Sequence, residues 1–84
     1  MQSVEQTQAT RSLPTLRLGS KGDDVKYLQV ILNFYGYELK VDGMFGSKTE
    51  VAVKEFQKSR KVKVDGIVGQ KTWNALLADY EPGC

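Results

Sequence analysis

Lys40–Ala52 reads KVDGMFGSKTEVA, and Lys63–Ala75, further along the chain, reads KVDGIVGQKTWNA. Eight of the thirteen positions are identical. Self-similarity at a fixed period indicates one structural unit that the chain uses twice. Each copy contains an Asp-Gly turn dipeptide, a second glycine shortly after it, and then a helical pattern. The repeat therefore predicts two equivalent Asp-Gly-x-x-Gly loops, each leading into a helix.

A further helix is predicted before the first copy of the repeat. Its start is placed near Ser20, because Ser20 and Asp23 have the spacing of a capping box. Apolar residues then recur at helical spacing. Gly36 suits the left-handed position that ends many helices, so the predicted helix ends there.

The two remaining helices follow the two loops. One is predicted from about Ser47 to Arg60, with Ser47 and Glu50 as a second capping box, and the other from about Gln70 to Asp79. The short apolar pieces elsewhere are too few to make a sheet. We therefore predict an all-α fold, a compact three-helix domain with two duplicated loops. Its core is predicted from the large apolar side chains Leu28, Leu32, Phe45, Phe56 and Trp73.

Composition limits the chemistry that this chain can perform. Its 84 residues contain no histidine, and the one cysteine, Cys84, is the last residue. Intramolecular disulfides, zinc sites with nitrogen or sulfur ligands, and Ser–His or Cys–His catalysis are therefore excluded or improbable. No pair of carboxylates is recognisably set in an apolar pocket, as a glycosidase needs. We expect no catalytic residue, no metal ligand and no cofactor.

The termini differ in character from the centre of the chain. Residues 1–15 are polar and predict a disordered arm or linker, residues 16–80 form the predicted domain, and residues 81–84 form a tail. No apolar run is long enough to span a membrane. The N-terminus also lacks the apolar core of a signal peptide. Either the protein stays inside the cell, or an export signal was removed or lies outside this chain.

The repeat is embedded in a longer series of motifs. In chain order these are Gly22-Asp23-Asp24-Val25, Leu28-Gln29, Asp42-Gly43-Met44-Phe45-Gly46, Thr49, Ala52-Val53, Phe56-Gln57, Asp65-Gly66, Gly69, Thr72 and Ala75-Leu76. With these motifs, the segment from Leu18 to Leu77 resembles the three-helix peptidoglycan-binding domain of bacterial and phage cell-wall hydrolases. The resemblance implies non-catalytic binding of peptidoglycan, for targeting or anchoring, at the cell wall, in the periplasm or outside the cell. The chain would be either a free-standing protein or a module of a larger hydrolase.

A second function stays open, because related domains also occur as propeptides of matrix metalloproteinases. The alternative is therefore a protein–protein interaction module. Tyr27 and Phe34, two helical turns apart, share a helix face that is partly distinct from the predicted core stripe and could dock a partner. The basic residues near the end of the second helix suit a helix C-terminus, and the net charge is only +2. We therefore expect no nucleic-acid partner, and we expect a monomer.

The predicted binding surface is a shallow crevice between the end of the first helix and the Asp-Gly loops. Its candidate residues are Gln29, Asn33, Tyr37, Asp42, Phe45 and Lys48. The aromatic ring of Tyr37 would stack on a sugar or stem residue, the aspartate and asparagine would hydrogen-bond amides, and the lysine would meet a stem carboxylate. Structural roles compete with this prediction, because the aspartates can accept N–H bonds within their own turns and the glutamines can satisfy loop backbone.

Overall fold

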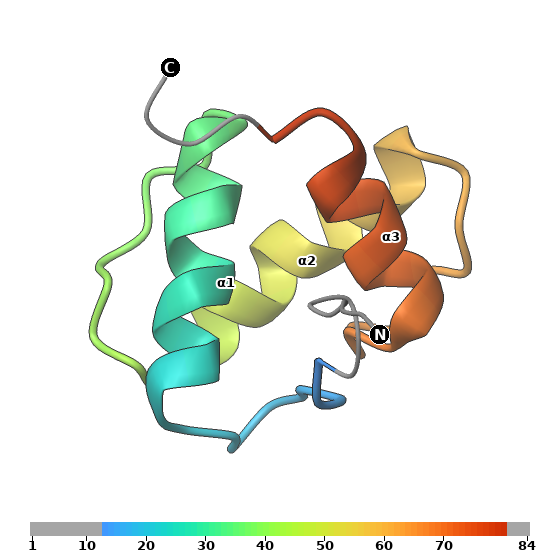
Figure 1. The fold of residues 1–84 in the computed structure, drawn as a ribbon. Helices are drawn as coiled ribbons and strands as arrows, with labels where there is room; N and C mark the ends of the chain where they lie inside the picture. Colours follow the sequence, from blue (N-terminus) through green and yellow to red (C-terminus); the bar gives the residue numbers. More distant parts are fainter. Residues whose placement is uncertain (1–12, 81–84) are drawn as a thin grey trace, which may run out of the picture.

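Three helices form the part of the protein that the computed structural model describes, residues 13–80 (Figure 1). They are α1 (Asp23–Phe34), α2 (Ser47–Ser59) and α3 (Gln70–Ala78), and no strand occurs within this range. Helix α1 contacts both α2 and α3, and α2 crosses behind them in Figure 1. The predicted all-α three-helix fold is confirmed. The predicted tail and most of the predicted arm lie outside the described residues, so the domain boundaries stay a prediction.

Each helix is preceded by a glycine at its N-cap position, and the predicted capping boxes are wrong. The N-caps are Gly22, Gly46 and Gly69, and none of the three helices has a side-chain cap hydrogen bond. The backbone of Ser20 is already used, because its carbonyl accepts the N–H of Phe45 at 2.9 Å, so α1 begins only at Asp23. For α2, the carbonyl of Gly46 accepts the first helical N–H bond, which places Ser47 inside the helix rather than at its cap.

Helices α1 and α2 end in the same way. After α1, the N–H of Gly36 donates to Asn33 and that of Tyr37 to Leu32; after α2, Lys61 donates to Lys58 and Val62 to Gln57. This is the pair of bonds found in a Schellman motif. The residue that turns the chain has a positive φ in both cases, 101° at Gly36 and 59° at Lys61. The predicted left-handed position of Gly36 is confirmed, and a lysine adopts the same conformation in the second copy.

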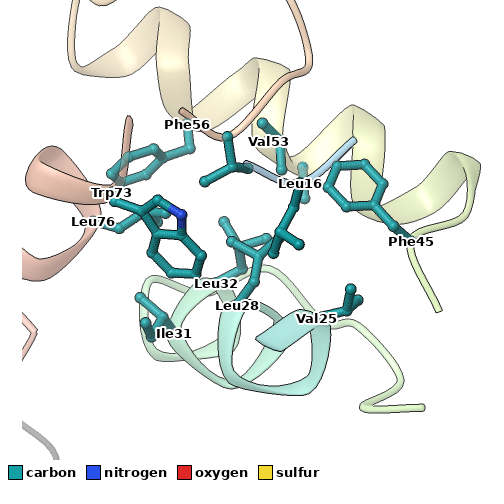
Figure 2. Close-up of a cluster of buried hydrophobic side chains, with 12 residues drawn as sticks. Leu16, Val25, Leu28, Ile31, Leu32, Phe45, Val53, Phe56, Trp73 and Leu76 are labelled. Carbon is teal, nitrogen blue, oxygen red and sulfur yellow. The ribbon is translucent and has the colours of Figure 1, made fainter. Parts of the chain in front are cut away.

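The core lies between the three helices and includes the inner residues of both loops (Figure 2). Phe56 is 1% exposed and Trp73 is fully buried, as predicted. The indole N–H of Trp73 donates to the carbonyl of Pro14 at 2.8 Å, so the ring is also tied to the segment before α1. The buried hydrophobic residues are Leu16, Val25, Leu28, Ile31, Leu32, Phe45, Ala52, Val53, Phe56, Val68, Trp73 and Leu76.

The segment before α1 joins the two loops. Leu16 pairs with Val68 through two backbone hydrogen bonds, of 3.1 and 2.8 Å, and Lys21 pairs with Met44 in a second isolated bridge. The chain entering the domain therefore contacts the second loop first and the first loop next. These two bridges hold both Asp-Gly loops against one body, which fixes where their outer surfaces lie.

Candidate functional site

The side chain of Gln29 holds the first loop, residues 35–46, in place. Its Oε1 accepts the backbone N–H groups of Asp42 and Gly43 at 3.0 and 2.9 Å. Its Nε2 donates to Asp42 Oδ1, to the Met44 carbonyl and to Thr49 Oγ1, at 3.1, 3.0 and 3.2 Å. Gln29 is 1% exposed. Because both ends of the carboxamide are engaged, its main role is to build the loop rather than to contact a ligand.

Gln57 does the same for the second loop, residues 60–69. Its Oε1 accepts the N–H groups of Asp65 and Gly66 at 3.1 and 3.0 Å. Its Nε2 donates to Asp65 Oδ1, the Ile67 carbonyl and Thr72 Oγ1, at 3.0, 2.9 and 3.1 Å. The glycines that follow the two aspartates share a φ of 76°. The two loops are therefore copies of one structure, as the repeat predicts.

Each loop aspartate has one oxygen turned to its own backbone. The N–H of Met44 donates to Asp42 Oδ1, and that of Ile67 to Asp65 Oδ1, both at 2.9 Å. These bonds, supported by the glutamine amides, lower the pKa of both carboxyls, so both are ionised at neutral pH. The Oδ2 atoms accept no hydrogen bond from residues 13–80, and both side chains are exposed. One carboxylate oxygen in each loop can therefore accept a hydrogen bond from a ligand.

A pocket of about 350 Å³ opens between the first loop and the start of α2, with Gln29, Asp42 and Lys48 in its lining. A groove of about 310 Å³ adjoins it and is lined by Tyr37 and, from α2, by Lys48, Val51 and Glu55. The linings of the two hollows have Leu39, Ser47 and Lys48 in common, so the hollows lie side by side, and we call the two together the crevice.

Four of the six predicted site residues line the crevice. Gln29 and Asp42 line the pocket, Tyr37 lines the groove, and Lys48 lines both. Phe45 lines neither hollow, because it is 2% exposed and belongs to the core. The sixth residue, Asn33, also lies outside the lining of both hollows.

The side chain of Asn33 holds the backbone of Leu39, which lines the crevice. Its Nδ2 donates to the Leu39 carbonyl at 2.9 Å, and its Oδ1 accepts the Leu39 N–H at 2.7 Å. These two bonds use the carboxamide on both sides and fix Leu39, which is shared by the two hollows. Asn33 therefore shapes the surface through the backbone of the loop.

Sequence reasoning missed the wall of the groove that α2 supplies. Val51 is 53% exposed and lies between Lys48 and Glu55 at the spacing of one helix face. An exposed valine between charged residues on such a face was the available signal. Val51 and Tyr37 line the same groove, and local sequence does not show that the fold places them there together.

The crevice combines an apolar wall with separated charges. Burial, and then the negative charge of Glu55, raise the pKa of the Tyr37 phenol, which is neutral and can stack or hydrogen-bond. Lys48 supplies a cation between the two hollows, and Asp42 supplies a carboxylate oxygen. Such a surface suits a ligand with apolar groups, amides and carboxylates. Within residues 13–80, no cluster of His, Cys, Asp or Glu could hold a metal ion.

Comparison with known proteins agrees with this architecture. Residues 21–76 match the model of a family described as "Putative peptidoglycan binding domain". The zinc D-Ala-D-Ala carboxypeptidase of Streptomyces albus G is 37% identical over 73 residues, which cover 83% of this chain and 29% of that protein. No helix within the described range is long and apolar enough to cross a membrane.

Solved structures give the same relationship. The endolysin of Burkholderia phage AP3 superposes with a TM-score of 0.76 at 44% identity, over 83% of this chain and 27% of that one. The N-terminal domain of SleB superposes with a TM-score of 0.76 at 40% identity, over 80% of this chain and 93% of that domain. The chain thus spans less than a third of the carboxypeptidase and of the endolysin, but nearly the whole of the SleB domain. The family match, the curated relative and the solved structures together show that this chain belongs to the peptidoglycan-binding domain family.

Proposed function

We propose that this chain binds peptidoglycan through the crevice, without catalysis, and so targets or anchors a protein at the bacterial cell wall. The main observation behind this proposal is that the two hollows adjoin at Lys48, with Tyr37 in the lining of one and Asp42 in that of the other. Tyr37 stacks on an apolar sugar or peptide face, Lys48 pairs with a stem carboxylate, and Asp42 Oδ2 accepts an amide N–H. Family membership supports the class of ligand. The place of action is then the wall, the periplasm or the cell exterior.

The position of Lys48 supports this assignment. It is the second residue of α2, in the first turn, where the helix dipole disfavours a cation. No ion pair or hydrogen bond within residues 13–80 involves its ammonium group. Its ammonium group is therefore available to pair with a carboxylate of a ligand in the crevice.

The binding test uses purified, insoluble peptidoglycan and a soluble disaccharide–peptide fragment. The chain should co-sediment with the wall, and the fragment should shift the amide resonances of residues 37–48. The dissociation constant should lie on the order of micromolar to millimolar, because an open crevice gives few buried contacts. Tyr37→Ala and Lys48→Ala should weaken binding, while Lys58→Ala, near the other end of α2, serves as the matched control.

Protein binding is the second candidate function. Tyr27, Val30 and Phe34 are 40%, 42% and 50% exposed and follow one face of α1. An exposed apolar stripe of this kind is typical of an interaction surface. Tyr27 also stacks on Trp73, with ring centroids 6.0 Å apart, so part of this face is anchored to the core. A chain that fails to bind walls from several bacteria, yet binds a protein through Tyr27 and Phe34, would favour this function over the first.

A further inference from the structure

The second loop carries a hollow of its own. Its volume is about 290 Å³, and Lys63, Asp65 and Lys71 supply its charged groups, with Val62 and Ile67 as apolar lining. At the offset of the repeat, these positions correspond to Lys40, Asp42, Lys48, Leu39 and Met44 of the first-loop pocket. Each hollow therefore presents one carboxylate, two lysines and two apolar side chains in corresponding positions.

The backbone beneath the two hollows is also the same. Gln57 repeats every hydrogen bond of Gln29, and the N–H of Ile67 fixes Asp65 Oδ1 as that of Met44 fixes Asp42 Oδ1. The Oδ2 atom of Asp65 is therefore presented as that of Asp42 is. The second hollow is a copy of the first-loop pocket in both scaffold and chemistry.

Lys71 has no partner that explains it within the described residues, whereas the positive charge of Lys63 also helps to lower the pKa of Asp65. Lys71 is the second residue of α3, as Lys48 is of α2, and a cation in a first helical turn is electrostatically unfavourable. Neither Lys63 nor Lys71 takes part in an ion pair or side-chain hydrogen bond within residues 13–80. Lys71, which lines this second, equivalent hollow together with Lys63, indicates a second contact with an anionic group.

We infer that the second loop forms a second site for the carboxylate and amide groups of a peptidoglycan stem peptide, so that one domain holds two repeats of the polymer. This inference rests on the proposed function of the crevice. The two loops lie at opposite edges of the molecule in Figure 1, and the residues that join them to α2, Thr49 and Gln57, are separated by about 12 Å along that helix. Two sites at different places on one domain raise the avidity for a repeating polymer above that of either site.

The two sites differ in one respect. At the same offset, Arg60 takes the place of Tyr37, Asn74 that of Val51, and Ala78 that of Glu55. The second hollow therefore has no counterpart of the adjoining groove with its aromatic wall. The second site should be the weaker one, and it should recognise the charged and amide part of the ligand alone.

The test titrates the isotope-labelled chain with a soluble disaccharide–peptide fragment of purified peptidoglycan. Shifts should first appear at residues 37–48 and, at higher concentration, at residues 62–72, with about two fragments bound per chain. Lys63→Ala combined with Lys71→Ala should remove the second set, leave the first, and weaken binding to the intact wall by about tenfold. The control is Lys58→Ala, an exposed lysine of α2 outside the three hollows.

The outcomes separate the two hypotheses. Shifts confined to residues 37–48, about one fragment per chain, and unchanged wall binding by the Lys63 and Lys71 double variant would overturn the second site and leave the proposed function intact. No shifts in either loop, together with no co-sedimentation, would overturn the proposed function and the second site with it.

Discussion

Gln29 and Gln57 make the same five hydrogen bonds, each to its own loop. The spacing from Gln29 to Gln57 is nevertheless longer than that between the loop aspartates, Asp42 and Asp65. The difference arises because the connection from α1 to its loop is longer than that from α2. Helix α2 belongs to both copies, since Thr49 closes the first and Gln57 opens the second. Three helices therefore suffice for two complete helix–loop–helix units.

Replacing Gln57 by glutamate should test this arrangement. In Gln57→Glu, a carboxylate would face Asp65 Oδ1 and the Ile67 carbonyl, so at neutral pH the free energy of unfolding should fall by about 3–5 kcal/mol. The pKa of the new carboxyl should be raised in the folded state, and the loss should shrink as pH falls and the group is protonated. Urea unfolding at several pH values measures this. Gln70→Glu, on the exposed start of α3, is the control and should have little effect. A uniform loss at every pH would contradict the prediction.

The two loop aspartates should contribute to acid unfolding. Their pKa values are lowered in the folded protein, chiefly by the N–H groups of Met44 and Ile67, so the folded state binds fewer protons than the unfolded chain. The stabilisation is present above about pH 4 and is lost as pH falls through the folded pKa values. Asp42→Asn combined with Asp65→Asn should therefore flatten the dependence of the melting temperature on pH below pH ~4. Parallel curves for variant and parent would show that these two carboxyls do not contribute.

The end of α2 offers a stabilising change. Lys61 has a φ of 59°, a conformation that costs a non-glycine residue about 1–2 kcal/mol, whereas glycine loses about 0.5–1 kcal/mol more conformational entropy on folding. Lys61→Gly should therefore raise the free energy of unfolding by about 0.5–1 kcal/mol. Gly36→Ala, at the matching end of α1, should lower it by about 1–2 kcal/mol. Urea midpoints compare the two, and changes of the same sign would contradict the shared geometry.

Core truncation should be severe in a domain of this size. Trp73→Ala should cost about 3–5 kcal/mol, since the ring is fully buried. Trp73→Phe keeps most of the ring but leaves the Pro14 carbonyl without its donor, and should cost about 1–3 kcal/mol. Thermal melts monitored by circular dichroism measure both. A melting temperature equal to that of the parent for either variant would contradict the assigned role of Trp73.

The sequence predicted the number and type of elements because the loop glycines and the helical spacing of apolar residues are local signals. It misplaced the start of α1 because the carbonyl of Ser20 accepts the N–H of Phe45, a hydrogen bond between distant parts of the chain. It left the roles of Gln29 and Gln57 open, since an amide after an apolar stripe can turn to a loop or to a ligand. The α2 wall of the crevice was missed because Val51 and Tyr37 are distant in the sequence and line one groove only after the chain has folded.

The lysines at the two helix starts should separate stability from binding. Lys48 and Lys71 lie in first turns, where their charge opposes the helix dipole, so Lys48→Ala and Lys71→Ala should each leave the free energy of unfolding unchanged or raise it by about 0.3–1 kcal/mol. Both should weaken co-sedimentation with the wall, with the larger loss for Lys48, which faces both hollows of the crevice. Lys58 lies in the last turn of α2, where a cation is favoured, so Lys58→Ala should lower stability slightly and leave wall binding unchanged. Stability and binding should thus respond differently at the two kinds of site. Loss of stability without loss of binding in Lys48→Ala and Lys71→Ala would show that these lysines serve the fold instead.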